Sequence, residues 1–335
     1  MSISGESCWS YGKVVALRGQ RQITEAAKYM SKTVNLPERL IANAQRIFLR
    51  AVRLYTYNTP IAKGKYRLFL IAMKLCGSPD GLLVDTRDKR TLSVDLSTGM
   101  QSMVYFLGEY EKVETAVVER LIRENNSKVF LDVGANFGWY TTIFNKYAKN
   151  SGQVHAFEPV PSIFDNLRRN YELMGFPPNV RINNIALGDR ELEITVNLFE
   201  GLSTGHASMS TQGRDDAVAF KCPMITLDSY LEANSVGDVD FVKVDIEGAE
   251  LGFLKGAERL FKQKKPPIWL MEMALNQTKN FGYLPNDLIE FMQSRADYEF
   301  FKINGLDGQL IKIDGFEDDD IGANVICIPP AVKHN

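Results

Sequence analysis

Cysteine is scarce in this sequence, and its few copies form no recognisable motif. The four cysteines are far apart, with no CxxC pair among them: Cys8, Cys76, Cys222 and Cys327. This spacing indicates neither a zinc site nor a disulfide framework, and it fits a reducing compartment. The first twenty residues also lack the apolar core and cleavage site of a secretory signal. We therefore expect a cytoplasmic protein.

Long apolar runs are missing as well. The longest one near the N-terminus, residues 68–73, reads LFLIAM. A membrane-spanning helix needs about 20 apolar residues in a row. The sequence therefore predicts a protein that is soluble or bound peripherally at a membrane surface.

Acidic residues are rare at the N-terminal end. Residues 1–75 contain thirteen Lys or Arg and three Asp or Glu, a balance of 13 − 3 = +10, although the whole chain is at −2. Apolar residues recur at helical spacing over 36–55 and again over 65–75, with arginines among them. We interpret residues 1–80 as a basic helical extension whose segment 36–75 contacts a membrane surface. The alternative is a solvated basic face.

The chain beyond residue 80 alternates between strand and helix patterns. Buried-type strands are predicted at 129–133, 154–158, 180–186, 241–245 and 268–273, with helices near 138–148, 161–173, 249–262 and 285–294. This order predicts an α/β domain over residues 81–335, with its core at 127–330. Its sheet is mostly parallel and covered by helices on both faces.

Three regions depart from this alternation. Residues 82–86 and 92–96 flank a charged turn and predict a β-hairpin. Residues 190–226 hold two strand-like stretches around a polar loop, an insertion that we expect over the carboxyl ends of the sheet. The tail has three strand-like segments without helices between them, at 300–303, 310–313 and 325–328. They predict antiparallel pairing at one edge.

The first core strand runs straight into a glycine-containing turn, VGANFG. Gly134 and Gly138 let the backbone approach a ligand closely, and the following helix points its N–H groups at that ligand. A dinucleotide fingerprint would be GxGxxG. This turn has no middle glycine, and Asn136 lies between its two glycines instead. The arrangement favours a ligand without phosphates. Asp132, at the end of the strand, is predicted to face the ammonium or sulfonium part of such a ligand, although a plain turn carboxylate is the alternative.

Polar residues follow the later strands too. Glu158 ends the second strand, 26 residues after Asp132, and a carboxylate there can accept both hydroxyls of a ribose. Asn184 and Ala186, at the end of the third strand, are predicted to lie at an adenine. Asp245 ends the fourth strand.

The other acidic residues near these strand ends also have purely structural interpretations. Glu247 and Glu250 follow the fourth strand and also suit a helix N-terminus. Glu272, on the fifth strand, also suits an ion-paired strand end.

These residues resemble the FkbM family of methyltransferases, which have the class I, Rossmann-like fold. The stretches that match, within residues 82–329, are FLGEYE at 106–111, LDVGANFGWYT at 131–141, VHAFEP at 154–159, NIALGD at 184–189 and VKVDIEGAE at 242–250. The resemblance implies a seven-stranded, mostly parallel sheet with an antiparallel final strand. It also implies S-adenosylmethionine (SAM) as methyl donor and a hydroxyl acceptor, often on a sugar, a glycan or a secondary metabolite. No tetrapeptide such as NPPY follows the fourth strand, so a nucleic acid is not the expected substrate.

An alkyl hydroxyl is a poor nucleophile and profits from a general base. Asp245 is the first candidate, from its place at a strand tip, and His206 in the inserted loop is the second, with an exposed loop histidine as its alternative. His155 lies inside a strand and is predicted to be a core residue. Asp245, Glu247 and Glu272 have a further interpretation as ligands of a divalent cation. Their spacing is not that of a tight metal motif, so no metal is expected.

Two other functions stay open at this point. A nicotinamide-dependent oxidoreductase would use a similar sheet, although the missing middle glycine and the antiparallel tail count against it. A non-catalytic binding module would keep the fold and dock on a membrane or an RNA through its basic helices.

Overall fold

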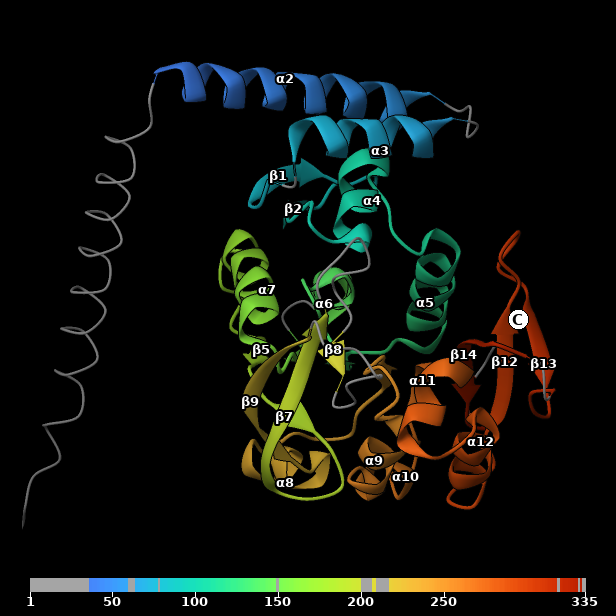
Figure 1. Ribbon diagram of the computed structural model, residues 1–335. Helices are drawn as coiled ribbons and strands as arrows, with labels where there is room; N and C mark the ends of the chain where they lie inside the picture. Colours follow the sequence, from blue (N-terminus) through green and yellow to red (C-terminus); the bar gives the residue numbers. More distant parts are fainter. Residues whose placement is uncertain are drawn as a thin grey trace, which may run out of the picture. The chain divides into compact units, whose positions relative to one another are not determined.

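The computed structural model describes residues 36–59, 64–77, 79–148, 151–199, 207–208, 217–317, 320–330 and 332. The chain divides into two compact units, one up to Gly77 and one from Ser78 onwards (Figure 1). Each unit is described by itself.

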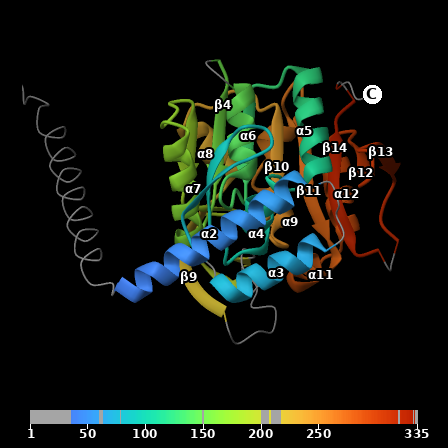
Figure 2. The ribbon, with the colours of Figure 1, turned by 90° about the horizontal axis from the view of Figure 1, so that it is seen from above.

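The first unit contains two helices, α2 (Leu36–Asn58) and α3 (Lys65–Cys76), which lie side by side (Figures 1 and 2). The Gln45 amide donates to the Leu75 carbonyl over 3.4 Å, and the Cys76 thiol donates to the Gln45 carbonyl over 3.6 Å. Both helices follow the apolar periodicity predicted for them. In the described part of the chain, no helix is long and apolar enough to cross a bilayer.

The second unit is built on an eight-stranded sheet with the order β13-β12-β14-β11-β10-β3-β4-β5. The strands are, in chain order, β3 (Val129–Val133), β4 (Gln153–Phe157), β5 (Val180–Asn183), β10 (Phe241–Val244), β11 (Ile268–Ala274), β12 (Glu299–Ile303), β13 (Leu310–Ile313) and β14 (Gly322–Ile328). The five strands from β5 to β11 are parallel. The final strand, β14, is antiparallel to both of its neighbours, which confirms the predicted class I arrangement. β13 adds an eighth strand, because it folds back on β12 as an antiparallel hairpin at the edge.

Helices cover both faces of the sheet, as the nearly continuous apolar strands require. On one face lie α5 (Lys112–Asn125), α6 (Trp139–Ala148) and α7 (Pro161–Leu173); on the other lie α8 (Leu227–Ala233), α9 (Glu250–Lys255), α10 (Glu258–Phe261) and α12 (Pro285–Gln293) (Figure 1). Phe144 of α6 stacks on Phe130 of β3 with ring centroids 4.9 Å apart. On the opposite face Phe261 of α10 stacks on Trp269 of β11 at 5.7 Å. These buried rings fix the sheet between its helices.

Two predicted elements are shorter than expected. The strand predicted at 180–186 ends at Asn183, and the next strand, β6 (Ala186–Leu187), belongs to another sheet. The helix predicted at 249–262 is two helices, α9 and α10. They part at Gly256, where a Cβ would lie 2.0 Å from the Gly188 carbonyl oxygen. Two backbone segments approach each other this closely only because residue 256 is glycine.

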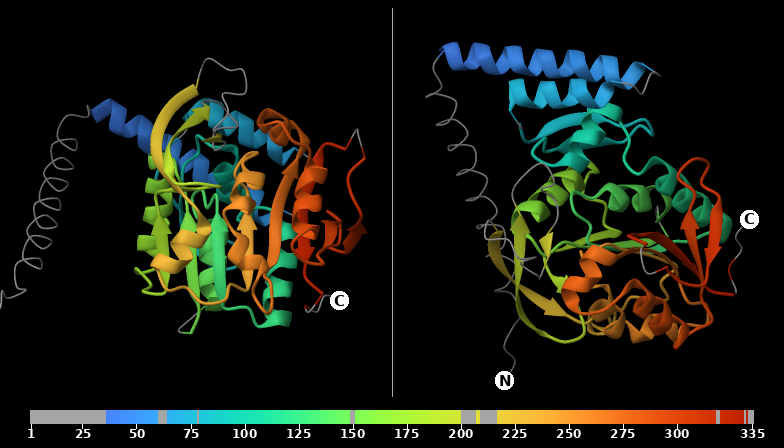
Figure 3. Two further views of the ribbon diagram at one scale, coloured as in Figure 1. Left: turned by 90° about the horizontal axis from the view of Figure 1, so that it is seen from below. Right: turned by 45° about the vertical axis from the view of Figure 1, so that its right-hand side comes forward.

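Smaller elements surround the main sheet. The predicted hairpin is present as β1 (Leu82–Asp85) and β2 (Thr91–Val94), and α4 (Gly99–Leu107) follows it. The inserted segment forms β7 (Leu192–Phe199), β8 (Ala207–Ser208) and β9 (Ala217–Ile225), which make a four-stranded sheet with β6 in the order β6-β9-β7-β8 (Figure 3). A short helix, α11 (Leu275–Thr278), follows β11 directly.

Candidate functional site

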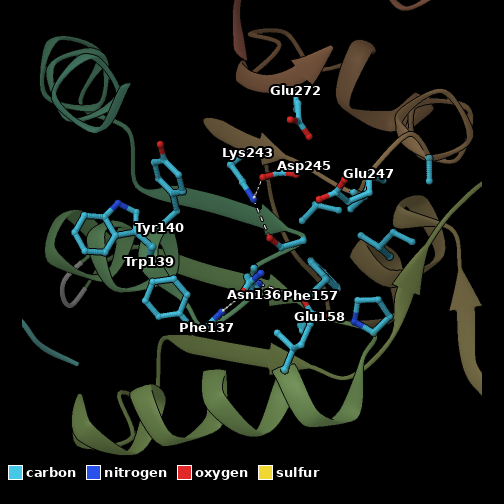
Figure 4. Close-up of a pocket in the computed structure, with 18 of the residues that line it drawn as sticks. Asn136, Phe137, Trp139, Tyr140, Phe157, Glu158, Lys243, Asp245, Glu247 and Glu272 are labelled. Carbon is cyan, nitrogen blue, oxygen red and sulfur yellow. Dashed lines mark hydrogen bonds and ion pairs between the residues drawn. The ribbon is translucent and has the colours of Figure 1, made fainter. Parts of the chain in front are cut away.

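A cavity lies at the carboxyl ends of the parallel strands, where ligands of open α/β sheets bind. Its walls come from the turn after β3, the tips of β4, β10 and β11, the segment before α5 and the small inserted sheet (Figure 4). All of these lining residues fall between Met100 and Asn324, in the second unit.

The turn after β3 requires glycine for a steric reason. Gly134 has φ +75°, and a Cβ there would lie 1.8 Å from the Asp245 carbonyl oxygen. Gly138 has φ +91°, and its Cβ would lie 2.7 Å from Leu167 of α7. Gly134 lines the cavity, whereas Gly138 is placed against α7 behind it. The first glycine therefore lets β3 and β10 end side by side at the cavity, and the second lets α6 begin close to α7.

Glu158 is fixed between two loops at the tip of β4. Its Oε2 accepts from the Asn136 N–H and its Oε1 from the Val160 N–H, both over 3.0 Å. Asn136 has a left-handed backbone, φ +52°, which turns its N–H toward the carboxylate. Glu158 is 4% exposed and lines the cavity together with Asn136. Burial raises the pKa of Glu158 to about 7, although the two N–H groups favour the charged form.

The predicted adenine residues take two different places. Ala186 lines the cavity with Ile185, Leu187 and Val196, an apolar wall suited to a flat ring. The Asn184 side chain does not line it. Its amide donates to the carbonyls of Glu158 and Pro159 over 2.8 and 3.0 Å, and so it holds the tip of β4 in place.

Asp132 is placed behind the cavity rather than in its wall. The side chain is fully buried, and its Oδ2 accepts from the Thr141 hydroxyl of α6 over 2.5 Å. Burial raises the pKa of this carboxyl group, against the lowering effect of Lys243. The direct contact with a ligand that the sequence predicts has no support in this geometry, because the carboxylate points at α6.

Lys243 is a buried cation in the cavity wall. Its Nζ donates to the Gly134 carbonyl over 2.8 Å and lies 3.4 Å from Oδ2 of Asp245 (Figure 4). Burial lowers the pKa of the Lys243 ammonium, but the charges of Asp245, Asp132 and Glu111 outweigh it and raise that pKa overall. The lysine therefore stays charged and ties the turn after β3 to the tip of β10.

Three carboxylates meet at the other side of this lysine. Asp245, Glu247 and Glu272 each place one oxygen within 4.8 Å of the others. Gln277 donates to Oε2 of Glu247 over 2.6 Å. The pKa of Glu272 is raised to about 10 by burial and by the charges of Asp245 and Glu247. At neutral pH the cluster therefore keeps a proton, and its oxygens suit either proton transfer or a divalent cation. The absence of a metal stays a prediction.

Glu250 and His155 occupy structural positions. Glu250 accepts from the N–H groups of Ile246 and Gly248 over 3.1 and 3.2 Å and does not line the cavity, so it stabilises the loop after β10. His155 is buried between the Tyr230 hydroxyl and Gln153, at 2.9 and 3.1 Å. Burial lowers the pKa of His155 to about 4, so it is a neutral core residue. His206 lies outside the described residues, and its role as a second base stays a prediction.

One side of the cavity is formed by residues that were not predicted as site residues. Tyr110 and Glu111, before α5, line it together with Trp139 and Tyr140 of α6. The Tyr140 hydroxyl donates to Oε2 of Glu111 over 2.7 Å. Lys243 was also missed, although a lysine inside an otherwise apolar strand was a usable signal.

The comparison with known proteins agrees with this geometry. Residues 132–300 match the Methyltransferase FkbM domain, which is half of the chain. This chain belongs to the FkbM methyltransferase family. The matched segment contains Gly134, Asn136, Glu158 and Asp245, whereas Glu111 lies before it.

Individual relatives of this FkbM-family protein match it in part. It is 31% identical over 144 residues to hexuronic acid methyltransferase AglP of Haloferax volcanii, covering 43% of this chain and 56% of AglP. It is 29% identical over 214 residues to AMB antimetabolite synthetase AmbE of Pseudomonas aeruginosa, covering 52% of this chain and 10% of AmbE. Among solved structures, methyltransferase FkbM of Methylobacillus flagellatus has a TM-score of 0.39 at 18% identity, covering 60% of this chain and 43% of that one. The matched region thus spans less than two thirds of each of these relatives.

Proposed function

We propose that this FkbM-family protein is a SAM-dependent O-methyltransferase that acts on a hydroxyl of a sugar, a glycan or a secondary metabolite. The observation that carries the proposal is Glu158. Its carboxylate is held at a strand tip by two N–H groups and faces a cavity whose neighbouring wall is apolar. Such a carboxylate can accept both hydroxyls of a ribose while the apolar wall packs on a nucleobase.

The residues present fit a nucleoside that carries no phosphate. The turn from Gly134 to Gly138 has no middle glycine, and the Asn136 N–H donates to Glu158 and not to a ligand phosphate. The carboxylates around the cavity would repel a phosphate and attract a cation. SAM would supply a methyl group that is already activated by its sulfonium charge, so alignment of the acceptor is the main task left to the protein.

The acidic cluster supplies the group that receives the proton of the acceptor. Asp245 lines the cavity and is the base that we propose, with Lys243 holding its carboxylate in place at 3.4 Å. A hydroxyl oxygen seated beside Asp245 would give up its proton to this carboxylate as it bonds to the methyl carbon of SAM. The bond from that carbon to the sulfonium sulfur would break at the same time, leaving S-adenosylhomocysteine. The identity of AglP as a hexuronic acid methyltransferase supports a sugar as acceptor.

The first test is ligand binding. Thermal shift and calorimetry with SAM, S-adenosylhomocysteine, NAD and NADP should show binding of the first two alone. Glu158→Gln should weaken SAM binding by roughly 10- to 100-fold, because a hydrogen-bonded charged acceptor contributes about 1.5–3 kcal/mol. Asp240→Asn is a matched control. Asp240 also accepts two N–H groups, from Lys128 and Val129, but it does not line the cavity. Stabilisation by NAD alone would overturn the proposal.

The second test is catalysis. Tritiated SAM should label a component among fractionated glycans and small metabolites, and Asp245→Asn should lower this transfer by about 100-fold or more while SAM still binds. SAM binding without transfer to any fraction would favour a binding module over an enzyme.

A further inference from the structure

One face of α2 is apolar and exposed along the whole helix. Leu40, Ile47 and Leu54 are 62%, 67% and 67% exposed, and they repeat every seven residues. Ile41, Phe48 and Tyr55 repeat in the same way one position later and are exposed too. Seven residues make nearly two helical turns, so all six side chains lie on one stripe. Exposed apolar stripes of this length are uncommon on soluble monomers and mark interaction surfaces.

Basic residues border this stripe. Arg46 and Arg50 are exposed and lie one turn apart, with Arg50 next to the stripe, while Leu49 and Val52 are buried. On α3, Ile71 and Leu75 are exposed, and Lys74 stands between them. Residues 36–77 contain eight Lys or Arg and a single Glu, a balance of 8 − 1 = +7.

We propose that α2 and α3 form a docking surface for an anionic lipid bilayer, with the apolar stripe in the acyl boundary and the arginines at the lipid phosphates. Only this occupant uses both features. An RNA would pair with the arginines and leave the apolar stripe in water. A second copy of the chain would cover the stripe but would bring two strongly basic surfaces together.

Vesicle flotation of the full chain tests the proposal. The chain should float with vesicles of phosphatidylcholine and phosphatidylserine, less with phosphatidylcholine alone, and less as salt rises. Ile47→Asp, and separately Arg46→Glu with Arg50→Glu, should each reduce the bound fraction by about tenfold or more. Leu306→Asp is the control, because Leu306 is exposed on the second unit.

Four results would overturn the docking surface. The chain could stay in solution with both kinds of vesicle, or the variants could float as well as the unaltered chain. Light scattering could also show a dimer without lipid that Ile47→Asp dissociates, which would assign the stripe to a second copy. RNA binding whose affinity is unchanged by Ile47→Asp, together with no flotation, would assign the surface to nucleic acid.

A separate observation concerns Glu111. Its backbone is left-handed, with φ +42°, a conformation that a residue other than glycine keeps only when its surroundings hold it there. Its carboxylate accepts from the Tyr140 hydroxyl and lies in the cavity wall. Among the described residues no Lys, Arg or His comes within 4.0 Å of it, and burial raises its pKa. Lys243 acts on this carboxylate only from beyond 4.0 Å, so Glu111, fixed in the cavity wall, suits a ligand cation at contact distance.

The structure assigns Glu111 the recognition of the α-ammonium group of SAM, an inference that rests on the proposed function. Glu158 stands after β4, beside the apolar wall, and Glu111 stands before α5, beside Tyr110 and Tyr140. The two carboxylates thus come from different parts of the cavity wall and suit different parts of one ligand. Aromatic rings beside Glu111 favour a cation further. Glu111 therefore takes the part that the sequence predicts for Asp132.

Calorimetry with two ligands distinguishes recognition of the aminoacyl chain from recognition of the nucleoside. The ligands are SAM and 5′-methylthioadenosine, which has the same nucleoside but no aminoacyl chain. Glu111→Gln should weaken SAM by roughly tenfold and leave methylthioadenosine unchanged. Tyr140→Phe should act in the same direction, and Glu158→Gln should weaken both ligands. Equal effects of Glu111→Gln on both ligands, or none, would overturn the assignment while SAM binding stands. If the unaltered chain binds neither ligand, the proposed function itself falls.

Discussion

Glu158 combines a position that suits a ribose with an environment that is unfavourable for its charge. Burial raises its pKa from 4.5 to about 7. Between these two values the unfolded chain releases the proton and the folded chain keeps it. The free energy of unfolding therefore falls as pH rises through this window.

The pH dependence of stability tests this environment. The raised pKa of Glu158 should lower the free energy of unfolding of the unaltered chain by about 3 kcal/mol at most as pH rises from about 4.5 to 7. Glu158→Gln has no proton to release in this window, so its urea midpoint should fall less with rising pH. The slope is the quantity to compare, because the substitution also leaves one N–H without its acceptor at every pH. Parallel curves for Glu158→Gln and the unaltered chain would contradict the raised pKa.

At this scale the sequence predicted the residues that follow strands. Gly134, Asn136, Glu158, Ala186 and Asp245 all line the cavity, because the ends of parallel strands meet at one edge. Side-chain direction was harder. Asp132 and Asn184 point into the protein, since strand alternation and local hydrogen bonds set their direction. Glu111 comes from a segment outside the alternating pattern, so no strand-end argument could find it.

The turn between β3 and α6 shows how an element depends on one residue. Gly134 and Gly175 both have positive φ, +75° and +81°. A Cβ at Gly134 would collide with the Asp245 carbonyl, whereas nothing lies within 4 Å of a Cβ at Gly175. The pair separates the cost of backbone conformation from the cost of a clash.

Alanine at each glycine tests this difference. Gly175→Ala should lower the free energy of unfolding by roughly 1–2 kcal/mol, the cost of left-handed backbone. Gly134→Ala should lower it by about 3 kcal/mol or more and should also weaken SAM binding, because β3 and β10 must move apart. Urea unfolding measures both. Equal losses for the two variants would show that the turn tolerates a side chain.

Elements with a clear pattern and marked ends were predictable, and helices begun by a single capping residue were not. The bounds of β3 and α7 agree with the prediction, because a glycine turn follows the strand and a proline begins the amphipathic helix. α4 and α8 were missed. Each is only a few turns or less, and its start is marked by one threonine, Thr98 or Thr226, whose side chain accepts from the N–H three residues later.

The cavity and the basic helices belong to different units of the chain. The cavity is lined from Met100 to Asn324, so the second unit contains every lining residue. A fragment of residues 78–335 should therefore bind SAM within about threefold of the full chain while losing its affinity for anionic vesicles. Calorimetry measures the SAM affinity, and flotation of the same preparation measures the vesicle affinity. Loss of SAM binding in a folded fragment would show that the first unit completes the site.

The most direct test of the central claim is a crystal structure of the full chain with S-adenosylhomocysteine. We predict the ribose hydroxyls on the Glu158 carboxylate, the base against Ala186 and Leu187, and the aminoacyl chain toward Glu111. A nucleoside bound elsewhere, or Glu158 turned away from its sugar, would contradict the account.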